Sequence, residues 1–236
     1  MEENGVSDMK IVLQVDRDFR DNVKFSFFCK SISHLIFNKN DYDLYVDHEK
    51  FISLVDLKVK KLRSILNNYD DDEVIMYLDA FDTIVVASNE EIEKKFISMD
   101  VDVVYSVESN CSPSKKLEEH FEMNKFINTG GIIFRNGVYK KILSLLDNSD
   151  VDSAILNNDQ YLHQVFAIPL LNKIRIKLDT DNEIFQSLYY EDVSNFRKVN
   201  NKIINRKSSK HPCVFHGNGC DGFTKINTFY ELFIKN

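Results

Sequence analysis

An alternation of short apolar runs with segments of helical periodicity, which begins at Met9, constrains the fold of this chain most strongly. The pattern predicts an α/β protein in which crossover helices pack on a central sheet. A chain of 236 residues is long enough for one such domain with a substantial core. The expected strands are residues 10–15 (KIVLQV), 42–46 (YDLYV), 73–78 (EVIMYL), 102–107 (DVVYSV), 131–134 (GIIF), 173–178 (KIRIKL) and 213–215 (CVF).

Apolar residues at helical spacing mark the helices expected between these strands. They are Phe28, Ile32, Leu35 and Ile36; Leu62, Ile65 and Leu66; and Val138, Ile142 and Leu145. Ser88 and Glu91 have the spacing of a capping box, which predicts the start of a further helix over residues 90–96. Residues 195–212 are polar, basic and weakly periodic, so we expect a long irregular segment there.

The overall composition limits the partners and the location that we expect. A net charge of −7 disfavours nucleic acid as a partner, because that binding needs a basic surface. No apolar run is long enough to span a bilayer, so no membrane partner is expected. The N-terminal residues MEENGVSDMK lack the basic start and the apolar stretch of an export signal, which favours a cytoplasmic location. We expect a flexible tail over residues 1–8 and a single domain over residues 9–236.

Cysteine spacing gives no sign of a zinc site. The four cysteines lie far apart or at a spacing unlike paired zinc knuckles. We therefore expect reduced thiols at Cys29, Cys111, Cys213 and Cys220.

Two aspartates follow the apolar run at residues 73–78 and form the first candidate site. Asp79 and Asp82 come where a buried strand ends, which is where α/β proteins bind ligands. They can serve one ion only if the chain turns at Ala80 and Phe81, because residues three apart in a strand point to opposite faces. Hard divalent ions favour such oxygen ligands. The alternative is that Asp79 caps a turn while Asp82 is only solvated.

A second candidate lies in the glycine-rich segment that follows residues 213–215. His216 comes at the end of this apolar run, and two carboxylates with one imidazole favour Mn²⁺ over Mg²⁺ or Ca²⁺. Gly217 and Gly219 can let backbone amides approach a phosphate, and Lys225 can neutralise it. The alternative is a glycine-rich turn whose histidine caps a strand.

Two further segments carry polar groups suited to a sugar. Asn128, Gly130 and Gly131 lie at the start of the strand expected at residues 131–134, where missing side chains can admit a ligand against the backbone. From this segment alone a β-bulge or turn is the preferred interpretation. Asp159 lies near the start of an apolar helical pattern. There it can orient a hydroxyl or stabilise positive charge, or simply cap the helix.

Taken in order, these segments resemble the glycosyltransferase domain of the procollagen lysyl hydroxylases, a family of collagen-modifying enzymes. The resemblance covers most of the chain. It runs through LKVKKL, VIMYLDAFDTIV, VYSVESNCSP, FINTGGIIF, NNDQYLHQVF, EIFQSL and FHGNG.

The resemblance implies a type A glycosyltransferase fold with a mixed, mostly parallel central sheet flanked by helices. It also implies Mn²⁺ and a uridine diphosphate (UDP) sugar, UDP-glucose or UDP-galactose, as donor. The acceptor is then hydroxylysine or galactosyl-hydroxylysine of a collagen-like protein. The family works in the secretory pathway, but because no export signal is visible we expect a viral factory or the host cytosol as the setting. The resemblance gives Asp79, Asp82 and His216 as metal ligands and Asp159 as the catalytic residue; the donor-binding residues are Lys58, Asn128, Gly130, Gly131, Gly217, Gly219 and Lys225.

The chain departs from the family in three places. Ser112 replaces an aromatic residue, so stacking against the acceptor is expected to differ. The acidic cluster of the family is reduced to Asn157, Asn158 and Asp159. Two extra residues, Asp221 and Gly222, precede Lys225.

Two other functions remain open at the level of sequence. A haloacid dehalogenase-like phosphatase also has an apolar strand that ends in an aspartate, but its second acid comes two residues later, whereas Asp82 comes three after Asp79. A non-catalytic nucleotide-sugar-binding protein would retain the metal site and lack turnover.

Overall fold

A computed structural model describes residues 9–15, 28, 42–46, 53–121, 125–147, 158–170 and 173–235. The tail expected at residues 1–8 lies outside the described residues. So does the helix expected around Ile32, apart from Phe28, which is buried.

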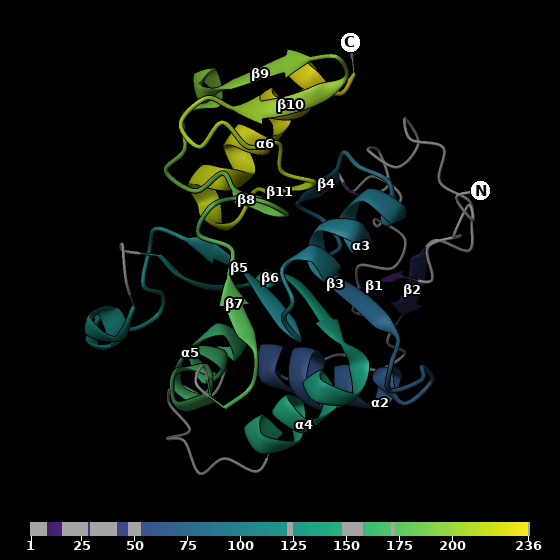
Figure 1. Ribbon diagram of the computed structural model, residues 1–236. Coiled ribbons are helices and arrows are strands. Elements are labelled where there is room, and N and C mark those ends of the chain that lie inside the picture. The colour runs from purple at the N-terminus through teal and green to yellow at the C-terminus, as the bar shows by residue number, and fades with distance from the viewer. Residues whose placement is uncertain are drawn as a thin grey trace, which may run out of the picture.

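A six-stranded sheet forms the centre of the molecule, in the order β2-β1-β3-β6-β5-β7 (Figure 1). β1 pairs in parallel with β2 and β3, and β5 pairs in parallel with β7, whereas β6 runs antiparallel between β3 and β5. The mixed, mostly parallel sheet expected from the sequence is therefore confirmed. Its strands are β1 (Lys10–Val15), β2 (Tyr42–Val46), β3 (Val74–Asp79), β5 (Val103–Glu108), β6 (Phe126–Arg135) and β7 (Ile176–Leu178).

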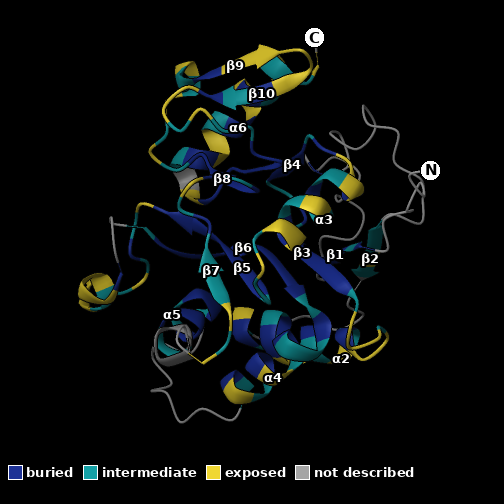
Figure 2. Cartoon of the chain, viewed as in Figure 1, coloured by how far each residue is buried: buried dark blue, intermediate teal, exposed yellow. Residues whose placement is uncertain are grey.

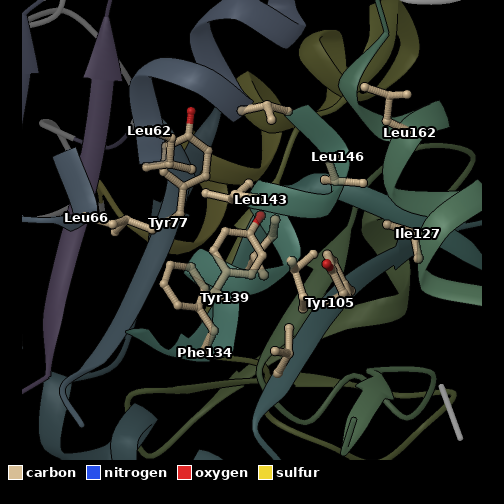
Figure 3. Close-up of a cluster of buried hydrophobic side chains, with 14 of the residues drawn as sticks. Leu62, Leu66, Tyr77, Tyr105, Ile127, Phe134, Tyr139, Leu143, Leu146 and Leu162 are labelled. Carbon is tan, nitrogen blue, oxygen red and sulfur yellow. The ribbon is translucent and has the colours of Figure 1, made fainter. Parts of the chain in front are cut away.

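Helices cover both faces of this sheet, because β3, β5 and β6 are apolar on both sides and are buried along nearly their whole length (Figure 2). On one face lie η2 (Asp56–Lys61), α2 (Leu62–Leu66), α4 (Asn136–Asp147) and α5 (Asp159–Leu170). Figure 3 shows the cluster beneath them, in which Tyr77, Tyr105 and Phe134 meet Tyr139, Leu143 and Leu162. On the other face, α3 (Asn89–Ser98) packs Ile92 and Phe96 against the sheet.

A smaller sheet, in the order β4-β11-β8, lies beyond the carboxyl end of β3. Its strands are β4 (Thr83–Val85), β8 (Phe185–Ser187) and β11 (Val214–His216). The helix α6 (Gly219–Phe233) and the hairpin of β9 (Phe196–Val199) and β10 (Lys202–Asn205) gather at this end of the molecule (Figure 1). A third apolar cluster joins them, with Phe196, Phe215 and Phe229 at its centre. Two short 3-10 helices, η3 (Lys115–His120) and η5 (Val193–Asn195), complete the described elements.

Several expected boundaries were wrong. Residues 195–212 contain the β9–β10 hairpin instead of an irregular segment, and it turns at Asn200 and Asn201, with φ of 48° and 63°. β6 begins at Phe126, so the segment expected to precede a strand lies inside one. β7 begins only at Ile176. Leu145, expected on the buried face of α4, is 49% exposed.

Of the capping box expected at the start of α3, the hydrogen bond to the Ser88 hydroxyl is present. Ser88 Oγ accepts the N–H of Glu91 at 3.3 Å, whereas the Glu91 carboxylate pairs with Lys202 and His211. Cys111 and Cys213 are free and buried, as expected. Among the described helices, none is both long and apolar enough to cross a membrane.

Candidate metal and donor site

The end of β3 places Asp79 and Asp82 together. The chain bends over residues 80–82, which confirms the expected turn, and Thr83 Oγ1 donates to Asp79 O at 2.7 Å across it. The Gly217 N–H donates to Asp82 O at 2.8 Å and ties the bend to the end of β11. Both aspartate side chains stay partly exposed, at 27% and 22%, so solvent and ligands reach them.

His216 completes a compact cluster with these two carboxylates. One ligand atom from each of the three residues lies within 4.8 Å of the others. His216 Nε2 lies 3.6 Å from Asp79 Oδ2 and 3.3 Å from Asp82 Oδ2. The three expected ligands, which come from distant parts of the chain, are therefore brought to one point.

Asn128 fixes which nitrogen of His216 faces the carboxylates. Its Oδ1 accepts the Gly130 N–H at 3.0 Å and lies 3.0 Å from His216 Nδ1. Because that oxygen can only accept, Nδ1 carries the proton and the lone pair of Nε2 points at Asp79 and Asp82. Histidine ligands in metal sites are oriented by this kind of contact.

The residues present fit a divalent cation. His216 Nε2 is buried and has no hydrogen-bond partner among the described residues. Burial lowers the pKa of His216, but Asp82 and Asp79 raise it by more, so its net pKa lies above the usual value. The negative charge of Asp79 and Asp82 also attracts a cation to the space between the three side chains. Two carboxylates with an imidazole suit Mn²⁺.

Lys58 links this cluster to Asp159. It lies in the π-helix η2, a geometry common at functional sites, and its Nζ is 2.6 Å from Asp79 Oδ1 and 3.8 Å from Asp159 Oδ2. Burial alone lowers the pKa of Lys58, but Asp159 and Asp79 raise it well above its usual value. Lys58 therefore remains charged.

Asp159 is the first residue of α5 and is only 3% exposed. Thr129 Oγ1 donates to its Oδ2 at 2.6 Å. The Asp159 carboxylate is enclosed between Thr129 and Lys58, and it reaches the cluster only through Lys58. These contacts favour a role for Asp159 in positioning Lys58 over direct contact with a substrate.

The glycines fulfil packing requirements of the fold. A Cβ on Gly130 would lie 2.0 Å from His216 Cε1, and one on Gly131 would lie 2.9 Å from Phe185 Cδ1. The space at these two positions, expected to admit a ligand, is therefore filled by side chains of the chain itself. β5 and β6 also change register across this segment, as the bulge alternative anticipated.

The glycines after β11 are constrained in the same way. A Cβ on Gly217 would lie 2.8 Å from Ile226 Cβ, and the Gly217 N–H is already bonded to Asp82 O. Gly219 has φ of 66°, which favours glycine. Lys225 Nζ lies 2.5 Å from Asp221 Oδ2. Asp221, one of the two residues extra to the family pattern, therefore pairs with this lysine.

A pocket of ≈ 430 Å³ lies next to the cluster, because Asn128, which contacts His216, also lines it. Most of its polar residues were not expected from the sequence. Glu108, at the end of β5, is 6% exposed and accepts hydrogen bonds from Gln160 and Asn218. Burial raises its pKa, although the bonds from Gln160 and Asn218 oppose the shift. Its position at a strand end, like that of Asp79, was the signal available in the sequence.

Two solved structures match nearly the whole chain. A glycosyltransferase involved in glycosylation of the major capsid of PBCV-1 has a TM-score of 0.53 and 11% identity, covering 95% of this chain and 99% of that one. The galactosyltransferase LgtC has a TM-score of 0.51 and 10% identity, covering 97% of each chain. At such identity the likeness concerns the fold, which is the type A glycosyltransferase fold.

Curated relatives share sequence as well. The rat and human proteins named multifunctional procollagen lysine hydroxylase and glycosyltransferase LH3 are 30% identical over 172 residues, which is 69% of this chain and 23% of each relative. The chicken procollagen-lysine,2-oxoglutarate 5-dioxygenase 1 is 30% identical over 173 residues. The match thus spans less than a quarter of these relatives. The model of the PLOD GT domain matches residues 54–233. The chain therefore belongs to the PLOD GT domain family, the glycosyltransferase domains that its motifs resemble.

Proposed function

We propose that the chain is a Mn²⁺-dependent hexosyltransferase that moves glucose or galactose from a UDP-sugar to hydroxylysine or galactosyl-hydroxylysine of a collagen-like protein. Membership of the PLOD GT domain family supports transfer of a sugar. The names of the relatives, which describe procollagen lysine as their substrate, support the acceptor. We further propose that residues 9–236 act as one domain.

The cluster of Asp79, Asp82 and His216 is the observation that carries this proposal. The buried Nε2 of His216 makes no hydrogen bond to the residues that the structure describes, and it faces two carboxylates. A divalent cation bound there supplies positive charge to the diphosphate of the donor and to the leaving UDP.

The surrounding residues hold the cluster in place. Lys58 restrains Asp79 from one side, Asn128 sets the ring of His216 from the other, and Asp159 keeps Lys58 charged and oriented. In this proposal Lys225 lies at the diphosphate end of the donor, whereas Gly219 lines the adjacent pocket. The acceptor hydroxyl occupies the adjacent pocket, where Glu108 provides a hydrogen-bond acceptor.

The direct test is to incubate the protein with Mn²⁺ and each UDP-sugar, with and without hydroxylysine and galactosyl-hydroxylysine, and to measure released UDP. We expect release that requires Mn²⁺ and rises with one acceptor. An Asp82→Asn variant should lose Mn²⁺-dependent UDP binding in calorimetry. The exposed Asp181 offers a matched control, and Asp181→Asn should bind as the unmodified chain does.

Two outcomes would point to the other functions. Mn²⁺-dependent UDP binding without release in any combination would identify a binding protein. An acid-stable aspartyl-phosphate on Asp79 would identify a phosphatase. The family and the fold favour the transferase.

A further inference from the structure

Two adjacent tyrosines form an unusual turn at the edge of the pocket that contains Glu108. The turn spans residues 188–191 and is closed by the Glu191 N–H, which donates to Leu188 O at 3.1 Å. Its third residue, Tyr190, has φ of 56°, a region that glycine and asparagine normally occupy. A bulky residue there is strained, and such strain persists where the surroundings impose it, often at functional sites.

Contacts from α6 and β8 impose this conformation. The Tyr190 N–H donates to Asp221 Oδ2 at 2.9 Å, and the Tyr189 N–H donates to Ser187 Oγ at 3.1 Å. The Tyr189 ring lies against Gly219, where a Cβ would approach its Cε2 to 3.0 Å. The two tyrosine rings lie 4.1 Å apart at 47°, so both are held as one unit.

The ring of Tyr190 remains largely exposed despite its contact with Tyr189. Tyr190 is 67% exposed, yet it lines the pocket together with Tyr189. Ser112 lines the same pocket with a small side chain, so Tyr189 and Tyr190 supply all of the aromatic surface among its lining residues. An exposed aromatic ring fixed at a pocket edge is suited to stack on a ligand.

The rest of the pocket identifies the chemistry of that ligand. Its polar lining combines the carboxylate of Glu108 with the side-chain amides of Asn128, Gln160 and Asn218, which bind hydroxyl groups as donors and acceptors. Asp221 is paired with Lys225, and the carboxylate of Glu108 repels a diphosphate, so the part of the lining around Glu108 does not suit the phosphates of the donor. A volume of ≈ 430 Å³ lies within the range of small-molecule sites, roughly 300–1,000 Å³.

We propose that Tyr189 and Tyr190 form an acceptor platform on which the sugar ring of an already glycosylated acceptor stacks, with its hydroxyls directed to Glu108 and the pocket amides. This inference rests on the proposed hexosyltransferase function and specifies its acceptor as a saccharide-bearing one. The C–H face of a pyranose meets the negative face of the tyrosine ring. Asn128, which contacts both the pocket and His216, places this acceptor beside the candidate metal site.

Tyr190→Gly is the truncation best matched to the backbone, because glycine accepts a φ of 56°. With galactosyl-hydroxylysine as acceptor we expect KM to rise roughly fivefold to tenfold, the effect of losing one aromatic contact. Tyr190→Phe should keep KM within about twofold. The Kd for UDP with Mn²⁺ should not change. Phe223→Ala removes another exposed aromatic residue of this region, 56% exposed and outside the pocket lining, and should leave KM unchanged.

Three results would overturn the inference. One is an unchanged KM in folded Tyr190→Gly. Another is weaker UDP binding in this variant with an unchanged acceptor KM, since the ring would then stack on the nucleobase. The third is equal use of free hydroxylysine and galactosyl-hydroxylysine by the unmodified chain.

Saturation-transfer NMR with galactosyl-hydroxylysine separates this inference from the proposed function. If no UDP is released under any condition, the transferase proposal fails, but binding that is lost in Tyr190→Gly still supports the platform. If the unmodified chain does not bind this probe in the presence of UDP and Mn²⁺, the platform is refuted.

Discussion

Replacing Gly130 with alanine should weaken metal binding while leaving every proposed ligand in the sequence. The new Cβ would lie 2.0 Å from Cε1 of His216 and 2.7 Å from both ring nitrogens. Ordinary van der Waals contact begins at 3.4 Å. The imidazole must therefore move by roughly 1 Å or more, a displacement that can cost a site about a hundredfold in function.

The ring cannot move away without losing its other contacts. Nδ1 is held by Asn128 at 3.0 Å, and Nε2 faces Asp82 at 3.3 Å. Metal–ligand distances tolerate about 0.2 Å, so a displaced imidazole no longer completes the cluster. We expect the affinity for Mn²⁺ to fall about 10- to 100-fold, the range seen when an orienting contact is lost. Overpacking should also cost about 1–3 kcal/mol of folding free energy.

Isothermal calorimetry with Mn²⁺ in the presence of UDP measures the affinity, and urea denaturation measures the folding free energy. Gly131→Ala is the matched control. Its Cβ would lie 2.9 Å from Phe185 Cδ1, in an apolar cluster on the other side of the strand, so it should destabilise the fold and leave Mn²⁺ affinity unchanged.

One outcome would refute the reasoning. If folded Gly130→Ala binds Mn²⁺ within about twofold of the unmodified chain, either His216 is not a ligand or its ring is not confined. Equal losses of affinity in both glycine variants would instead attribute the effect to general destabilisation.

Three further predictions concern stability and are checked by urea denaturation. Lys58→Met leaves the buried Asp159 without its cation and should cost about 3 kcal/mol, much of which Asp159→Asn should restore in the double variant. Burial lowers the pKa of His163 to about 4, so the folded state binds fewer protons than the unfolded state between about pH 6.5 and 4. The free energy of unfolding should therefore fall by about 2 kcal/mol from pH 7 to 5. His163→Asn should remove most of this pH dependence. Asn201, with φ of 63°, lies in the β9–β10 turn, and Asn201→Gly should stabilise the chain by about 0.5 kcal/mol; destabilisation would contradict the turn.

Sequence reasoning predicted the central strands well because their signal is local. Apolar runs such as residues 73–78 are buried on both faces, and composition alone identifies that environment. Asp79 and Asp159 could be placed at the ends of elements for the same reason. The β9–β10 hairpin was missed because charged residues flank Asn200 and Asn201 and obscure the strand alternation. Asparagine tolerates the positive φ of such a turn, but the pair lacks the glycine that usually marks it.

The pocket could not be predicted in the same way, since its residues become meaningful only through contacts between distant segments. Gln160 accepts from Asn128 at 3.4 Å and donates to Glu108 at 2.6 Å, which joins α5, β6 and β5. Glu108 could be noticed at a strand end, but an isolated glutamine such as Gln160 carries no sign of these contacts. The same holds for Tyr190, whose strained φ is a product of its bond to Asp221.

Strand register explains how the candidate metal cluster arises from segments more than a hundred residues apart. β11 runs antiparallel to β4, and the pairing sets His216 opposite Thr83, the residue that follows the bend after Asp79. A slip of one residue would turn the imidazole to the opposite face of the small sheet. The Gly217 N–H, bonded to Asp82 O, and the Leu188 N–H, bonded to His216 O, lock this register on both sides of β11. Gly130 is needed because the imidazole, once set by this register, lies directly against β6. The metal cluster is thus specified as much by the backbone pairing of β11 as by its three side chains.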